Sequence, residues 1–381
     1  MEGLISRGHE VILLTKFSPP AGFSSKIKTV NVVSGWRLLP QIARLVFRFP
    51  QRFLPGLVLG FHSTLQILKT ECSVMQIIRQ EQIEIIHTHF FSPGGENCVI
   101  ASGANGIPVI ATLRGAELRN YPEINYGSMR SSSFRHWFHC SKPSVSFFTA
   151  PNSELAGLLV KRYGIPVEKV ARVPNGVSDL ENLGKVTFSC RVRLKMIAIG
   201  WLTPLKNHQV ILRALRYIAS DKVSLTIVGE GYLEKTLRDN ISDWGLRNVE
   251  LSPNLEREKL MSKLSTADCL IHPSLVEGMP NVVLEALALG VPCIASDISA
   301  HRDLITENYD GFLFPAEDDS ELSRVIESVA NNRRKISALK PNCVRTAKAH
   351  SLEIKLDRYE TIYRSELIGR SLSLPAQSRS T

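Results

Sequence analysis

The sequence predicts an α/β protein of two doubly wound domains, each a parallel sheet covered by helices on both faces. Continuous apolar runs such as "IEIIHTHF" (83–90) and "VSLTIVG" (223–229) alternate with helix-length segments along most of the 381 residues. Strands that are buried on both faces have this continuous pattern. A polar connection around 178–192 interrupts the alternation, which then restarts. We therefore expect two domains with a ligand in the cleft between them.

Composition narrows the class of protein. The chain is 44% hydrophobic and 22% charged, as globular proteins are, and lacks the ~18 uninterrupted apolar residues of a membrane span. The N-terminus has no signal-peptide layout, which predicts a cytoplasmic protein. Seven scattered cysteines without a C-x-x-C pair support neither a metal site nor a disulfide framework. We expect Cys269 and Cys293, which lie in apolar runs, in the core.

The elements follow in order along the two domains. In residues 1–180 the expected strands are "VILLT", "TVNVVS", "IEIIHTHF", "IPVIATLRG", "SVSFFTAPN" and "VARVPNGV", with a helical stretch to about residue 80 and a segment near 95–105. In residues 193–345 they are "LKMIAIG", "VSLTIVG", "VELSPN", "DCLIHPS", "VPCIAS" and "GFLFP". The amphipathic stretch within 346–367 predicts a helix that packs back toward the first domain, followed by a disordered polar tail at 368–381.

The most informative stretch is "HPSLVEGMPNVVLEALALGVPCIAS" (272–296). A strand ends at its start, and a helix begins with Pro280 in its first turn and ends at Gly290. The interior of this helix is apolar on all sides, which predicts burial. Its only polar side chains are Asn281 and Glu285, four residues apart on one face.

Two carboxylates can converge near the start of this helix. The side chain of Glu285 tilts toward the helix N-terminus and hence toward the loop that carries Glu277. Free N–H groups at a helix N-terminus bind phosphate, and carboxylates accept hydrogen bonds from sugar hydroxyls. The pattern favours a nucleotide-sugar pocket. The alternative is that Glu285 pairs with a buried Lys or Arg and that Glu277 is a solvated loop acid.

These residues resemble the retaining glycosyltransferases of family 4, which have the GT-B fold of two facing Rossmann-like domains. The E-x7-E motif is present as Glu277 and Glu285, and A-x-G-x-P follows from Ala288. Neighbouring family segments occur in the right order at 170–177, 197–207, 227–237 and 310–322. The resemblance implies transfer of a hexosyl group from a nucleoside-diphosphate sugar to a hydroxyl of a glycan or glycolipid, as in cell-surface polysaccharide synthesis.

The family implies roles for matched positions. Glu285 would accept the ribose hydroxyls, and Lys206 would neutralise the leaving diphosphate. Glu277 and the backbone of Gly278, Met279, Pro280 and Asn281 would hold the sugar and the diphosphate. Gly200, Trp201 and Gly229 lie in the other donor-binding segments. The implied reaction retains configuration by same-face substitution and needs no metal, no further cofactor and no carboxylate nucleophile.

The sequence departs from the family at three places, of which the third is the start of the chain, described below. Trp201 stands where an Arg is usual, and Arg114 with Gly115 replaces the usual His-Gly. We expect Arg114 either to supply positive charge, to contact the acceptor, or to form a surface ion pair. His89 lies on the same face of its strand as His87, as two metal ligands would, but no third ligand is evident, which favours a cleft or packing role. Trp201 and the missing start described below keep an alternative open, a catalytically weakened nucleotide-sugar-binding protein or a gene fragment.

A basic segment predicts a partner surface. Residues 1–70 hold nine Lys and Arg against two Glu. Within 36–61, three arginines (Arg44, Arg48 and Arg52) recur at helical spacing among apolar residues. This pattern fits peripheral contact with the anionic inner face of a membrane, or else packing inside the first domain. Nucleic-acid binding is not expected, since no recognised module accompanies the charge.

The first residues resemble the middle of a family element. In the family, a strand and a glycine-rich turn precede a helix that ends in the R-G-H-E-V pattern, which here is residues 7–11. We therefore expect that first strand and turn to lie before Met1, and the chain to be an N-terminally truncated fragment or to begin at a misassigned start.

Overall fold

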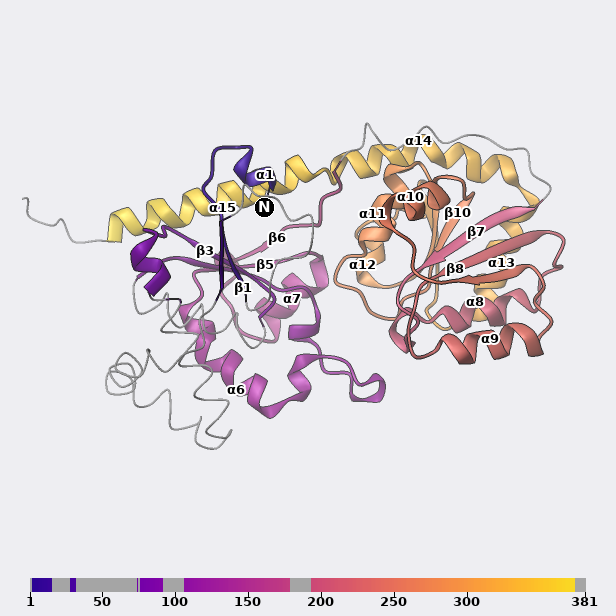
Figure 1. Cartoon of the computed structure of the whole chain (residues 1–381), viewed down its shortest axis with the longest axis horizontal. Coiled ribbons are helices and arrows are strands. Elements are labelled where there is room, and N and C mark those ends of the chain that lie inside the picture. Colours follow the sequence, from indigo (N-terminus) through magenta and orange to yellow (C-terminus); the bar gives the residue numbers. More distant parts are fainter. Residues whose placement is uncertain are drawn as a thin grey trace, which may run out of the picture. The chain divides into compact units, whose positions relative to one another are not determined.

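The computed structural model describes residues 2–15, 28–31, 74, 76–91, 106–178 and 193–373, and the chain forms two compact units (Figure 1). The first unit comprises Met1–Pro151, Leu155–Val173 and Leu356–Thr381. The second comprises Asn152–Glu154 and Pro174–Lys355. The expected segment near 95–105 and most of the helical stretch before residue 80 lie outside the described residues.

The first unit contains a parallel four-stranded sheet in the order β3-β4-β5-β6. Its central strand β4 is buried throughout, as its continuous apolar sequence predicts. A separate parallel pair, β1-β2, lies near the N-terminus. The bounds are α1 (Glu2–Ile5), β1 (Ile12–Thr15), β2 (Lys28–Asn31), β3 (Ile86–His89), β4 (Val109–Thr112), α6 (Ser132–Ser141), β5 (Phe147–Ala150), α7 (Ser153–Lys161) and β6 (Val170–Arg172).

The last helix, α15 (Leu352–Ser373), joins the first unit from Leu356 onwards. Tyr359, Ile362 and Tyr363 are buried in one cluster with Ile110 of β4. The hydroxyl of Tyr363 lies 2.6 Å from Nδ1 of His87. This apolar stripe fixes the helix on the sheet, and the helix continues beyond residue 367, into the stretch expected as tail. Residues 374–381 lie outside the described part.

The second unit contains a parallel six-stranded sheet in the order β12-β11-β10-β7-β8-β9. Numbered from β7, this is the Rossmann order 3-2-1-4-5-6, in which the chain reverses direction across the sheet between β7 and β10. Ligands of such sheets bind beyond the carboxyl ends of the strands at this switch point. The bounds are β7 (Leu194–Ile199), β8 (Val223–Val228), β9 (Val249–Ser252), β10 (Cys269–His272), β11 (Cys293–Ser296) and β12 (Gly311–Phe314).

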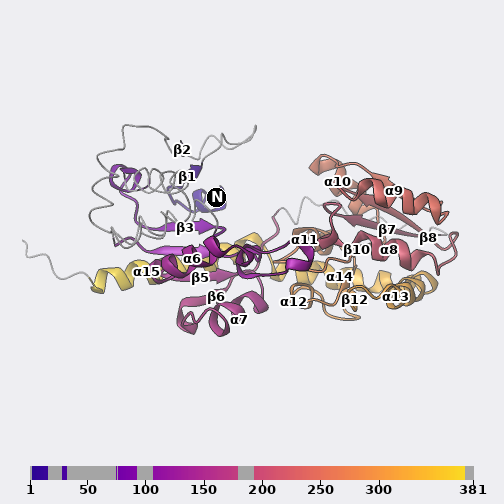
Figure 2. The same ribbon diagram turned by 90° about the horizontal axis from the view of Figure 1, so that it is seen from below.

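Helices cover this sheet on both faces, with α8 and α9 on one side and α10 and α11 on the other (Figure 1). Figure 2 gives the perpendicular view of the same layers. Helix α14 packs against α11 and so covers the helix of the E-x7-E motif. The bounds are α8 (His208–Leu215), α9 (Glu234–Asp243), α10 (Arg257–Ser265), α11 (Asn281–Ala288), α12 (Ser299–Arg302), α13 (Asp319–Asn331) and α14 (Arg333–Ala349).

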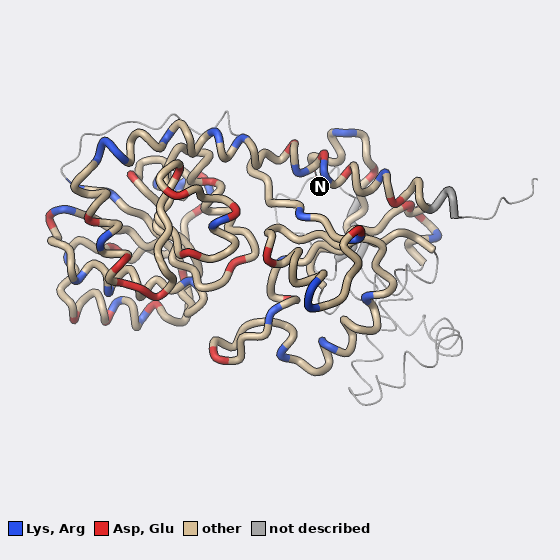
Figure 3. The backbone as a smooth tube through the Cα atoms, turned by 180° about the vertical axis from the view of Figure 1, so that it is seen from behind, with Lys and Arg blue, Asp and Glu red and all other residues tan. Residues whose placement is uncertain are grey.

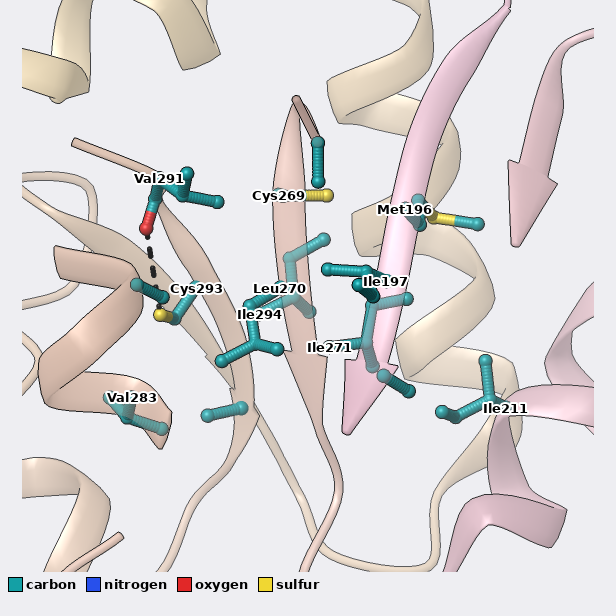
Figure 4. Packing of buried hydrophobic residues seen from close by; sticks show 14 of the residues in the cluster. Met196, Ile197, Ile211, Cys269, Leu270, Ile271, Val283, Val291, Cys293 and Ile294 are labelled. Carbon is teal, nitrogen blue, oxygen red and sulfur yellow. Dashed lines mark hydrogen bonds between the residues drawn. The ribbon is translucent and has the colours of Figure 1, made fainter. Parts of the chain in front are cut away.

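The core of the second unit forms around its central strands (Figure 4). Ile197 of β7, Ile271 of β10 and Ile294 of β11 are at most 2% exposed. Cys269 and Cys293 are fully buried, which confirms their expected core positions. Burial raises the pKa of both thiols, which keeps them protonated. This buried core holds the strands in place, and the loops of the site begin where these strands end.

Part of the chain's basic charge, including the segment expected to contact a membrane, lies outside the described residues. The basic segment 36–61 is among the residues that are not described. In the described part, Lys and Arg recur along α14 and are spread over other elements (Figure 3). Among the described helices, none combines the length and the apolar character that a bilayer crossing requires.

Candidate active site

Lys206 and Glu277 form an ion pair at the switch point of the second unit's sheet. Lys206 ends the short 3-10 helix Pro204–Lys206 that follows β7, and Glu277 lies in the loop after β10. The Nζ atom of Lys206 donates a hydrogen bond to Oε1 of Glu277. Their side chains are 23% and 12% exposed, respectively. The structure thus brings together the two residues that the family resemblance marks as catalytic.

His272, the last residue of β10, contacts the same carboxylate. Its Nε2 lies 3.1 Å from Oε1 of Glu277 and 3.2 Å from Oγ of Ser274. Burial lowers the pKa of His272, so the neutral ring donates from Nε2 to the carboxylate. Burial alone would raise the pKa of Glu277, but the hydrogen bond from His272 and the charge of Lys206 hold it well below its usual range. Glu277 is therefore an ionised acceptor and not a solvated loop acid.

Two further histidines surround this pair and complete a histidine cluster of His208, His272 and His301. Burial and the neighbouring His272 lower the pKa of both His208 and His301 to about 3. Nδ1 of His301 donates to the carbonyl of Ser296 at 2.7 Å, and its ring meets that of His272 edge-on at 5.2 Å. Nδ1 of His208 and Nε2 of His301 are buried without a hydrogen-bond partner among the described residues. The three histidines are buried and neutral, and His272 contacts the carboxylate of the ion pair.

Glu285 pairs with an arginine of the neighbouring helix. Nη1 of Arg257, the first residue of α10, donates to Oε1 of Glu285 at 2.8 Å. The side chain of Glu285 is 15% exposed, whereas that of Arg257 is 70% exposed. The partner of Glu285 is therefore an exposed arginine, and not the buried cation that the alternative required.

Two asparagines hold the loop between Glu277 and α11. Nδ2 of Asn152 donates to the carbonyl of Gly278 at 2.6 Å. Nδ2 of Asn175 donates to the carbonyl of Met279 at 3.2 Å and to Oδ1 of Asn281 at 2.9 Å. Helix α11 begins at Asn281, with Pro280 as the residue before it rather than inside its first turn. The asparagines thus hold the carbonyls of the loop next to the first turn of α11, whose N–H groups have no acceptor within the helix.

Close backbone packing requires a glycine at position 229, in the loop after β8. A Cβ atom on Gly229 would lie 2.0 Å from the carbonyl oxygen of Gly200. The loops after β7 and β8 are also joined by a 2.8 Å hydrogen bond from the N–H of Leu202 to the carbonyl of Glu230. Trp201, between these contacts, is 64% exposed. An exposed indole at the carboxyl edge of β7 therefore occupies the position where the family usually has an arginine.

In the first unit, the ends of β3 and β4 bring His89 and Arg114 together. Nη2 of Arg114 lies 3.3 Å from Nδ1 of His89. The buried carboxylate of Glu117 accepts hydrogen bonds from the N–H groups of Phe91, Arg114 and Gly115 at 2.9 to 3.2 Å. Gly115 has a φ of 133°, which favours glycine. Glu117 therefore shapes the loop that presents Arg114.

His87 has a packing role. Its Nδ1 contacts the Tyr363 hydroxyl, and its Nε2 lies 2.6 Å from Oγ1 of Thr112. Within the part of the chain that the structure describes, no group of three or more His, Cys, Asp or Glu is arranged to hold a metal ion.

Comparison with protein families covers nearly the whole chain. Residues 192–348 match the family model "Glycosyl transferases group 1", and residues 1–179 match "Glycosyltransferase Family 4". The chain belongs to the group 1 and family 4 glycosyltransferases. The sequence resemblance to this family and its GT-B fold are therefore confirmed.

Relatives and solved structures agree with this assignment. The glycosyltransferase is 26% identical over 312 residues to the UDP-Gal:alpha-D-GlcNAc-diphosphoundecaprenol alpha-1,3-galactosyltransferase of Escherichia coli, which covers 76% of this chain and 77% of the relative. A glycosyltransferase from Rickettsia africae ESF-5 matches with a TM-score of 0.73 at 15% identity, over 96% of this chain and 92% of the other. Anabaena HepE in complex with UDP and glucose matches with a TM-score of 0.68 at 17% identity, over 93% and 99%.

Several residues around the glycosyltransferase motif were not predicted as part of the site. His272 and His208 could have been found, because one ends the strand before the motif and the other follows Lys206 by two positions. His301, Arg257 and Glu117 gave no comparable signal. His301 and Arg257 come close to the site residues only through the packing of their elements, whereas Glu117 lies two residues after Gly115.

Proposed function

We propose that this glycosyltransferase moves a hexosyl group from a uridine-diphosphate sugar to a hydroxyl of a glycan or lipid-linked acceptor, with retention of configuration. The ion pair of Lys206 and Glu277 beside the N-terminus of α11 carries the proposal. It combines a cation for a diphosphate with an ionised acceptor for sugar hydroxyls, at the position where parallel sheets bind ligands.

The relatives support the choice of donor and acceptor. The Escherichia coli relative is named for UDP-Gal as donor and for a diphosphoundecaprenol-linked GlcNAc as acceptor. The HepE structure contains UDP and glucose. We infer an acceptor of the same lipid-diphosphate class, reached at the inner face of a membrane through residues 36–61. Nucleotide-sugar binding without transfer is the second candidate, because Trp201 removes one charge from the usual basic pair, but the glycosyltransferase relatives do not favour it.

The chemistry follows from the charge that develops at the leaving group. The bond between the anomeric carbon and the β-phosphate oxygen breaks, and a bond to the acceptor oxygen forms on the same face of the sugar. The acceptor proton passes to the leaving phosphate. Lys206 and the first N–H groups of α11 stabilise the UDP that forms, while Glu277 and its neighbours orient the sugar. These groups perform the proposed reaction without a metal ion.

A transfer assay tests the proposal. The purified chain is incubated with a panel of UDP-sugars and a lipid-linked GlcNAc-diphosphate, with and without EDTA, and the anomeric configuration of the product is read by NMR. We expect UDP release that depends on the acceptor, an α-linked product from an α-linked donor, and no effect of EDTA. UDP binding with no transfer to any acceptor would favour the second candidate, and an inverted product would contradict the proposed stereochemistry.

A further inference from the structure

Arg257 holds one oxygen of Glu285 and leaves the other open. The only polar contact that the structure describes for the side chain of Glu285 joins Oε1 to Nη1 of Arg257 at 2.8 Å. Oε2 has no partner among the described residues. Arg257 thus fixes one oxygen of the Glu285 carboxylate on this mostly apolar helix, and the other oxygen is available to accept a hydrogen bond from a ligand.

The position of Arg257 is not explained by the stability of its own helix. Arg257 is the first residue of α10, where a cation opposes the helix dipole. Leu264 of α10 is fully buried, and Leu260 and Met261 pack against the same core, so the helix is anchored without the arginine. Helix α10 packs against α11, which sets Arg257 within reach of Glu285.

We propose that Arg257 is a positioning residue for recognition of the donor's ribose. By binding Oε1, it selects the conformer of Glu285 in which Oε2 accepts a hydrogen bond from a ribose hydroxyl. This inference rests on the proposed function, in which Glu285 binds the ribose of the donor. It adds a residue of this chain that acts through Glu285 and need not touch the nucleotide.

If the ion pair of Arg257 and Glu285 had only a structural role, nucleotide binding would respond differently to its loss. An exposed pair contributes little to stability, and its loss would change the binding of every nucleotide equally or not at all. If Arg257 positions Glu285, its removal changes only the part of the binding free energy that comes from the ribose hydroxyls. The discriminating readout is therefore the ratio of affinities for UDP and for analogues that lack one hydroxyl.

The experiment measures binding of UDP, 2′-deoxy-UDP and 3′-deoxy-UDP to the full chain by calorimetry. For Arg257→Ala we expect UDP affinity to fall about fivefold to tenfold, the scale of one hydrogen bond. Affinity for the analogue that lacks the contacted hydroxyl should change less than twofold by the same reasoning. Arg257→Lys should restore part of the UDP affinity. Arg238→Ala removes an exposed arginine that pairs with Glu234 on α9 and serves as the matched control.

Three outcomes would overturn the positioning role. They are an equal loss for all three nucleotides, an unchanged UDP affinity, and tighter UDP binding after removal of Arg257. Glu285→Gln separates this inference from the proposed function. If Glu285→Gln does not change the preference of the wild-type chain for UDP over its deoxy analogues, the ribose role of Glu285 fails, whatever Arg257 does.

Discussion

Lys206 and Glu277, which are 71 positions apart in the sequence, meet in an ion pair where β7 and β10 lie side by side. The strand order places their loops on either side of the switch point. His272 adds a third contact to the same oxygen of Glu277. A carboxylate that is held by two donors is both ionised and oriented before any substrate arrives, as preorganised catalysis requires.

The exposed Trp201 predicts a gain from restoring the cation. Trp201→Arg should raise kcat/KM for the UDP-sugar by about threefold to tenfold, because a second cation near the leaving diphosphate adds a charge-assisted contact. Steady-state kinetics with varied donor measure this effect. Tyr217→Arg, at another exposed aromatic residue of the second unit, is the control for added charge. An equal gain in both variants would show a general electrostatic effect.

The buried histidines predict a loss of stability in mild acid. The pKa of His301 falls from about 6.5 in the unfolded chain to about 3 when folded, so between these values the unfolded chain binds more protons. The free energy of unfolding should therefore fall as the pH decreases from 6.5 toward 3, by up to about 1.4 kcal/mol per pH unit for each such group.

Substitution of His301 measures how much of the pH dependence of stability comes from this residue. In His301→Asn, the amide can still donate to the carbonyl of Ser296 and does not titrate, so urea unfolding at pH 7, 5.5 and 4.5 should show a shallower slope. His139→Asn, at an exposed histidine, should keep the wild-type slope. Equal slopes in all three proteins would contradict the buried neutral state.

Close packing predicts that Gly229 accepts no side chain. Gly229→Ala would place a methyl group 2.0 Å from the carbonyl oxygen of Gly200, so the two loops must separate. We expect a loss of about 2 to 4 kcal/mol in the free energy of unfolding, as for other overpacked sites, together with weaker UDP binding. Gly157→Ala on α7, where a Cβ meets nothing within 4 Å, should instead stabilise by about 0.5 to 1 kcal/mol. A Gly229→Ala protein as stable as the wild type would contradict the packing.

The structure predicts that the loop that carries Arg114 is stabilised by the carboxylate of Glu117. Glu117→Ala leaves the N–H groups of Phe91, Arg114 and Gly115 without their buried acceptor. The expected cost is about 3 kcal/mol, measured by denaturant unfolding. Glu123→Ala, an exposed glutamate nearby in sequence, should change stability by less than about 0.5 kcal/mol. Similar small losses in both variants would exclude the proposed support of the loop.

The sequence identified the fold because continuous apolar runs separated by helices have few other solutions than covered parallel sheets. Glu277 and Glu285 were predicted because the motif sets them at fixed spacing around a strand end and a helix start, and Lys206 was predicted from the resemblance of segment 197–207 to the family. Arg257 was missed because an exposed arginine at the start of a polar helix carries no local sign of its partner. His301 was missed for a related reason, since only the packing of α12 brings it to His272.

The central claim is transfer of a sugar by way of the Lys206–Glu277 pair. The most direct measurement is acceptor-dependent UDP release by the wild type, Lys206→Ala and Glu277→Gln, with UDP affinity and melting temperature recorded for each. Lys222→Ala, which removes an exposed partner of Glu327, is the control. The account predicts transfer by the wild type and the control, and a loss of about 100-fold or more in kcat for the two site variants while they remain folded. Undiminished transfer by either site variant, or UDP binding without transfer by the wild type, would contradict it.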